Sequence, residues 1–121
     1  MRLLEPEITV ARVGNATTVV AVQGELDLNS ADELRAALDT DEAANGSRLI
    51  VDLVGTTLID STALGLIAGA AKSLSRTGGG VTVVANDPRV VRIFRLTGLD
   101  QKIPVERSLA EAIARPHVPA V

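Results

Sequence analysis

The chain has 121 residues, of which 46% are hydrophobic, so it suits a single domain with its own core and is not a disordered tail. It contains no cysteine, which excludes disulfide frameworks, thiolate nucleophiles and thiolate metal sites. The net charge is −3 and the only aromatic residue is one phenylalanine, so we expect no nucleic-acid partner.

Neither end of the sequence predicts a targeting or membrane signal. Acidic residues near the N-terminus precede any apolar segment typical of a signal peptide. The longest apolar run with glycine, residues 64–71, is far shorter than a bilayer span. We therefore expect a cytoplasmic protein without direct membrane insertion. One domain is predicted over 1–121, with a core over about 7–114 and a flexible tail over 115–121.

The first predicted elements are two strands joined by a turn. Apolar residues recur at Ile8 and Val10 and again over residues 19–22, with Gly14-Asn15 between the two stretches. This dipeptide is favoured in hairpin turns. The sequence therefore predicts a β-hairpin.

A helix is predicted next. Asn29 or Ser30 is expected to cap it, and Glu33 lies three residues after Ser30, as in a capping box. Leu34 and Leu38 then follow with helical spacing. Residues 45–46, Asn-Gly, are expected to end this helix.

Strands and helices alternate in the second half. An apolar run over 48–53 suits a strand covered on both faces. A short loop leads to a helix from about Ser61 to 76–77, and the glycines at 78–80 form a turn before a strand over 81–85. Asn86 or Asp87 caps a helix that has Pro88 at its first position and ends near Leu96. The last expected elements are an edge strand over 102–105 and a helix capped by Ser108 that ends near Ala114.

This element order predicts the fold class. A hairpin followed by alternating helices and strands indicates an α/β domain. We expect a mixed sheet of four to five strands with about four helices packed against it.

The helix that begins near Ser61 has an apolar side and a small, polar side. At 100° per residue, the apolar sector holds Leu64, Ile67, Ala70, Ala71 and Leu74. The opposite sector holds Ser61, Gly65, Gly69, Lys72 and Arg76. Each glycine costs the helix about 1 kcal/mol relative to alanine. Either a partner packs closely against the two glycines, or they are tolerated or lie under a neighbouring loop.

Ser61 itself suits three roles: helix cap, nucleophile or phosphate acceptor. Hydrolysis is disfavoured because Ser61 lacks the flanking glycines of a nucleophile elbow. The one histidine, His117, lies in the predicted tail and is a poor general base. A cap needs only one of Asp60, Ser61 and Thr62.

The glycines at 78–80 lack the Lys-Ser/Thr of a phosphate-binding loop, and no residues have metal-ligand spacing.

A phosphate on Ser61 would act mainly on a partner. It would carry nearly two negative charges at neutral pH, which a helix N-terminus tolerates. Beside Asp60 and Asp27 it would add like charge to a closely packed surface and weaken binding there.

The arginines over 89–95 are spaced by three and predict a solvated helix face.

Four motifs resemble the STAS-domain anti-sigma factor antagonists of bacteria (anti-anti-sigma factors), and the resemblance covers about residues 7–114. They are Gly24-Glu25-Leu26-Asp27 with Ser30-Ala31 and Glu33-Leu34; Val51-Asp52-Leu53; Ile59-Asp60-Ser61-Thr62-Ala63-Leu64-Gly65; and Leu96-Thr97-Gly98-Leu99-Asp100.

The resemblance implies a single STAS-like domain that is a regulator of transcription, not an enzyme, without catalytic residues, cofactor or metal. The unphosphorylated form is expected to bind an anti-sigma factor that is also a serine kinase, releasing the sigma factor in a stress response. Phosphorylation at Ser61, or at Thr62 as the second candidate, switches binding off, and a serine phosphatase restores it. The expected partner-binding residues are Asp27, Asp60, Ser61, Thr62, Gly65, Gly69 and Lys72.

One residue departs from the family pattern. Ala63 replaces the usual glycine, and we expect its methyl group to lie near the contact surface. STAS domains also occur without phosphorylation. The alternative function is therefore a constitutive interaction subunit of another complex, such as a lipid-transport system.

Overall fold

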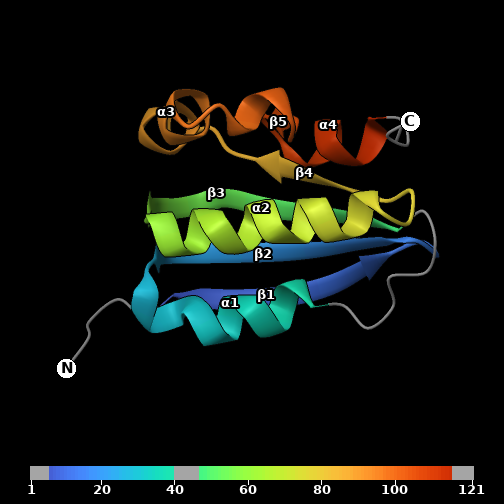
Figure 1. Ribbon diagram of the computed structural model, residues 1–121, viewed down its shortest axis with the longest axis horizontal. Helices are drawn as coiled ribbons and strands as arrows, with labels where there is room; N and C mark the ends of the chain where they lie inside the picture. The colour runs from blue at the N-terminus through green and yellow to red at the C-terminus, as the bar shows by residue number, and fades with distance from the viewer. Residues whose placement is uncertain (1–5, 40–46, 116–121) are drawn as a thin grey trace.

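The computed structural model describes residues 6–39 and 47–115. In that part of the chain, five strands form one sheet in the order β1-β2-β3-β4-β5, flanked by four α-helices (Figure 1). The elements are β1 (Glu7–Val13), β2 (Thr17–Leu26), the 3₁₀ turn η1 (Leu28–Ser30), α1 (Ala31–Leu38), β3 (Arg48–Ile59), α2 (Ser61–Ser75), β4 (Gly80–Val84), α3 (Pro88–Leu96), the 3₁₀ turn η2 (Leu99–Gln101), β5 (Val105–Glu106) and α4 (Leu109–Ala114). The predicted α/β class is confirmed.

The sheet is mixed because only its first strand pair is antiparallel. β1 pairs with β2 as the predicted hairpin, and Gly14 in the turn has a φ of +68°, which favours glycine. The pairs β2–β3, β3–β4 and β4–β5 are parallel. The carboxyl ends of four neighbouring strands therefore lie along one edge of the sheet.

The core fills both faces of the central strands. Val20, Val51 and Val83 belong to the larger buried cluster, which also contains apolar side chains of α1, α2 and α3. On the opposite face, Val19, Ile50 and Val84 pack with Ala112 and Leu109 at α4. The apolar residues of the nearly continuous run over 48–53 are thus buried on both faces of the sheet, as predicted.

β3 is longer than the sequence predicts. The strand continues through the expected loop as far as Ile59, with irregular pairing to β2. Buried Thr56 fixes this extension, because its hydroxyl donates to the Val22 carbonyl at 3.0 Å. A polar side chain on the strand therefore satisfies a backbone group that the irregular ladder leaves without its regular partner.

Ser30, one of the two expected residues, occupies the N-cap position of α1, but without the side-chain capping bond expected there. Asp27 caps the η1 turn, accepting a hydrogen bond from the Asn29 N–H at 3.0 Å. The Ser30 hydroxyl accepts from the Asp27 N–H and donates to the Asp27 carbonyl, so it makes no capping bond to α1. The predicted end at residues 45–46 lies outside the described residues, and α1 ends at Leu38.

The C-terminal third agrees closely with expectation. α3 spans Pro88–Leu96 with Asp87 as its cap, and α4 is capped by Ser108. The edge strand is displaced to Val105–Glu106, because the backbone N–H groups of Lys102 and Ile103 donate to Leu99 and complete the η2 turn instead. Pro116 and His117 lie outside the described residues. Within the described ranges, no helix has the length and apolar character to cross a membrane.

Candidate functional site

The two acidic residues singled out in the sequence lie at adjacent strand ends. Leu26 and Ile59, the last residues of β2 and β3, are paired across the parallel ladder. The Asp60 N–H extends this pairing by donating to the Leu26 carbonyl at 3.0 Å. Asp27 and Asp60 directly follow these paired residues, and both side chains are half-buried. The fold thus brings two acidic residues that are 33 positions apart in the sequence to neighbouring strand ends.

Asp60, not Ser61, caps α2. Its carboxylate accepts the Ala63 N–H at 3.0 Å, and its carbonyl accepts the Leu64 N–H at 3.0 Å. Ser61 is the first residue of the helix, and its side chain is exposed. No residue in the described part of the chain forms a hydrogen bond with the Ser61 hydroxyl. Of the three roles left open by the sequence, the cap is therefore excluded for this serine.

The outer side of α2 is exposed as the helical spacing predicts. Leu64, Ile67 and Leu74 are buried against the sheet. The exposed residues of the opposite side are Ser61, Gly65, Gly69, Lys72 and Arg76. A Cβ atom at Gly65 or Gly69 would meet nothing within 4 Å, so neither glycine lies under a described loop. The helix backbone is open to solvent at both positions.

The two residues after Ser61 are less exposed than the serine itself. Thr62 is half-buried, in contrast to exposed Ser61. Ala63 is 1% exposed and packs within the core. Its methyl group therefore does not lie near the contact surface, and that expectation is wrong. The replacement of the family's usual glycine fills the core beneath the site.

An apolar residue that the sequence reasoning missed lies beside Asp27. Leu28 is 70% exposed, although leucine is usually at least partly buried in a small domain. The family motif passes from Asp27 to Ser30 without Leu28, and the periodicity of the helix that follows begins later, so neither pattern includes this leucine. The available signal was Asp27 itself. A charged residue that ends the apolar pattern of a strand just before a turn indicates that the leucine after it need not be buried.

The described residues contain neither a metal site nor a phosphate-binding loop. They contain no group of three His, Cys, Asp or Glu side chains that could hold a metal. The triple glycine is a turn in which the N–H groups of Gly78, Gly79 and Gly80 donate to Ser75, Leu74 and Ser47. Because these N–H groups are already bonded, they do not form a phosphate cradle. His117 lies outside the described residues.

The comparisons with known proteins place this arrangement in one family. Residues 7–112 match the STAS domain, and the chain belongs to the STAS domain family. It is 32% identical to an anti-sigma-B factor antagonist of Listeria monocytogenes over 87 residues, covering 72% of this chain and 76% of the relative. The corresponding protein of Bacillus subtilis is 34% identical over 86 residues, covering 71% and 78%.

A solved structure agrees over almost the whole fold. The crystal structure of an anti-sigma factor antagonist from Mycobacterium paratuberculosis superposes with a TM-score of 0.80 at 29% identity, covering 90% of this chain and 92% of that one. The mixed five-stranded sheet and four helices described above therefore match the architecture of anti-sigma factor antagonists.

Proposed function

We propose that the chain is an anti-sigma factor antagonist whose unphosphorylated form binds an anti-sigma factor with serine-kinase activity and thereby releases a sigma factor. The family and the names of the Listeria and Bacillus relatives support the antagonist role. Ser61 is the proposed phosphorylation site, Thr62 is the second candidate, and a serine phosphatase reverses the modification. The observation that carries the proposal is the Asp60 cap, which leaves the exposed Ser61 hydroxyl available for modification.

Phosphorylation at this position is compatible with the fold. Transfer joins the γ-phosphorus of ATP to the Ser61 oxygen and releases ADP and the hydroxyl proton. The product carries nearly two negative charges at neutral pH. The first N–H groups of α2 lack intrahelical partners, and the helix dipole favours an anion there. The domain therefore stays folded while its surface charge changes.

The effect of the phosphate falls on the partner. The proposed contact surface consists of Asp27, Asp60, Ser61, Thr62, Gly65, Gly69 and Lys72, and we add Leu28 to it. A dianion beside the Asp60 carboxylate must be desolvated when a partner covers this surface, and no cation of the surface lies in the same helical turn. A penalty of about 3 kcal/mol weakens binding by about two decades.

A second function rests on the open backbone of α2. The absence of any Cβ neighbour at Gly65 and Gly69 would let a partner helix approach closely whether or not Ser61 carries a phosphate. In that case the chain is a constitutive interaction subunit of another complex, such as a lipid-transport system. Gly65→Leu would then abolish binding, and Ser61→Asp would have little effect.

Capture from a lysate of the native host separates the two functions. Wild type, Ser61→Ala and Ser61→Asp serve as baits, and bound proteins are identified by mass spectrometry. We expect wild type and Ser61→Ala to retain an ATPase-type anti-sigma kinase and Ser61→Asp to lose it. Incubation of the recovered kinase with ATP should then place phosphate on the wild type and not on Ser61→Ala. Equal recovery of one partner by all three baits contradicts the switch and supports the constitutive role.

A further inference from the structure

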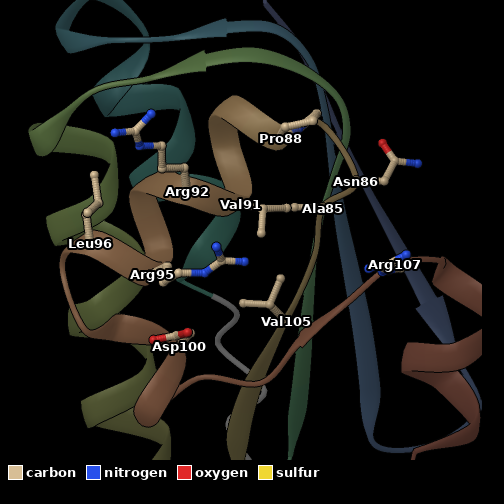
Figure 2. Close-up of a pocket in the computed structure, with 10 residues that line it drawn as sticks. All are labelled: Ala85, Asn86, Pro88, Val91, Arg92, Arg95, Leu96, Asp100, Val105 and Arg107. Atoms are coloured by element: carbon tan, nitrogen blue, oxygen red, sulfur yellow. The ribbon is translucent and has the colours of Figure 1, made fainter.

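A cleft of about 940 Å³ lies between α3, η2 and the ends of β4 and β5, and none of the residues proposed to contact the anti-sigma factor lines it. Its apolar lining includes Ala85, Val91 and Val105. Figure 2 shows the Arg95 guanidinium beside Val91 and Val105, with Arg107 on the β5 side of the cleft. All of its lining residues fall within 85–107, so none belongs to α1 or α2.

The cleft is positively charged in a protein whose net charge is negative. Three arginines and one aspartate line it, Arg92, Arg95, Arg107 and Asp100, which gives a formal charge of +2. Two acidic residues that neighbour the lining residues in sequence already form ion pairs with other arginines. Glu106 pairs with Arg115 and Asp87 with Arg89, both at 2.7 Å. The three lining arginines form no ion pair or hydrogen bond with any residue in the described ranges.

The rim of the cleft has the composition of a protein interface. Leu96 is 72% exposed and lies in the same helix as Arg92 and Arg95. Arginine is enriched at protein interfaces, and exposed apolar side chains grouped with polar ones mark binding surfaces. A ligand confined to the cleft floor would leave Leu96 in water, whereas a polypeptide that crosses the rim would cover it.

We propose that this cleft docks an acidic segment of a partner protein, with carboxylates beside Arg95 and Arg107 and an aliphatic side chain on Val91 and Val105. The inference goes beyond the proposed function, because the surface involves none of the residues expected to contact the anti-sigma factor. Nucleic acid fits the surface less well. Asp100 interrupts the positive charge, the floor is apolar, and no aromatic side chain lines it for base stacking.

Fluorescence anisotropy with a labelled synthetic peptide, in which leucines separate pairs of glutamates, tests the proposal. We expect wild type to bind it, and the affinity to fall as salt is added. The double variant Arg95→Gln/Arg107→Gln should lower the affinity about tenfold, since two exposed charge pairs are lost. Arg76→Gln, which removes an exposed arginine from the end of α2, is the matched control and should bind like wild type.

Further binding measurements with other peptides and variants identify what the cleft recognises. A peptide with serine in place of leucine should bind more weakly, because the apolar floor loses its contact. Ser61→Asp should leave the peptide affinity unchanged. No binding by wild type, equal affinity of the double variant, or tighter binding of a thymidine oligonucleotide overturns the proposal. A loss with Ser61→Asp as large as with the double variant also overturns it, because the two surfaces would then be one.

Discussion

The Asp60 carboxylate accepts a hydrogen bond from the Ala63 backbone N–H at 3.0 Å, so the residue before Ser61 closes the N-terminus of α2. The structural role of helix cap is thereby separated from the regulatory role that we propose for Ser61. If Ser61 were the cap, a phosphate on its oxygen would change the group that accepts the first N–H bond of the helix. With Asp60 as the cap, Ser61 can change its charge while α2 keeps its first turn.

This division predicts different stabilities for variants of the two residues. Asp60→Ala should lower the free energy of unfolding by about 1 kcal/mol, because the cap is lost. Ser61→Ala should change it by less than about 0.5 kcal/mol, as an exposed side chain without a described partner. Urea unfolding measures both values. Asp60→Asn is the control, since asparagine caps helices as well as aspartate. A larger loss for Ser61→Ala than for Asp60→Ala would assign the cap to the serine.

Replacing Gly65 should separate stability from binding. Gly65→Ala is expected to raise the free energy of unfolding by about 1 kcal/mol, because alanine favours the helix and its Cβ meets nothing within 4 Å. The same methyl group should weaken binding to the anti-sigma factor, because it prevents close approach to the helix. Thermal unfolding and a binding titration of the same sample test the two effects. Unchanged affinity would show that the partner does not pack against this helical turn.

At Gly79, in contrast to Gly65, the structure leaves no room for a side chain. A Cβ atom there would collide with the backbone carbonyl of Ser47 and lie in tight contact with that of Leu74. Those carbonyls accept hydrogen bonds from Gly80 and Gly79, so the backbone has little room to move. Gly79→Ala should therefore destabilise the domain by about 2 kcal/mol, within the range for overpacking. Urea unfolding beside Gly65→Ala gives the comparison, and a stabilised Gly79→Ala would contradict the observed packing.

Much of the fold follows from local patterns in the sequence. The hairpin, the helix over Pro88–Leu96 and the helix after Ser108 were predictable, because turn dipeptides, proline at a first position and caps act within a few residues. The extension of β3 was not, because it depends on pairing with the distant strand β2, including the bond from Thr56 to Val22, which lies 34 residues away. Long-range bonds of this kind leave no periodic signal.

The site shows the same division between local and long-range information. The exposed side of α2 followed from helical spacing, and the family motifs indicated Ser61, Asp60 and Asp27. The identity of the cap did not follow, since Asp60, Ser61 and Thr62 are all suitable residues and only the backbone geometry selects one. The burial of Ala63 could have been predicted from the same spacing. Counted at 100° per residue from Ser61, Ala63 falls between Ala70 and Leu74 in the apolar sector.

Leu28 should contribute to partner binding without stabilising the domain. It is 70% exposed and follows Asp27 at the strand edge that also bears Ser61. Leu28→Ser should weaken binding to the anti-sigma factor about tenfold, as an apolar contact is lost at the interface. Its free energy of unfolding should stay within about 0.5 kcal/mol of wild type.

The matched control is Leu96→Ser. Leu96 is 72% exposed but belongs to α3 and the rim of the arginine-lined cleft. Titration of both variants with the anti-sigma factor should show a loss only for Leu28→Ser. Equal losses would indicate that the factor covers both surfaces.

The cap of α3 should give the domain a measurable pH dependence. The Arg89 side chain and then its backbone N–H donate to Asp87, and together they lower the pKa of that carboxyl to about 2. An unfolded aspartate has a pKa near 3.9. Because the folded-state pKa is the lower one, the ionised carboxylate stabilises the fold above about pH 4, and this contribution is lost as the pH falls toward about 2.

Urea unfolding of wild type and Asp87→Asn over this pH range isolates the effect. The difference in unfolding free energy between the two proteins should be constant above about pH 5 and shrink between about pH 4 and pH 2. Other carboxyl groups titrate in both proteins, so their contribution cancels in the difference. Arg89→Gln should move the same loss to a higher pH, because the pKa of Asp87 then lies closer to its usual value. A difference that stays constant down to about pH 2 would mean that the Asp87–Arg89 pair does not form in solution.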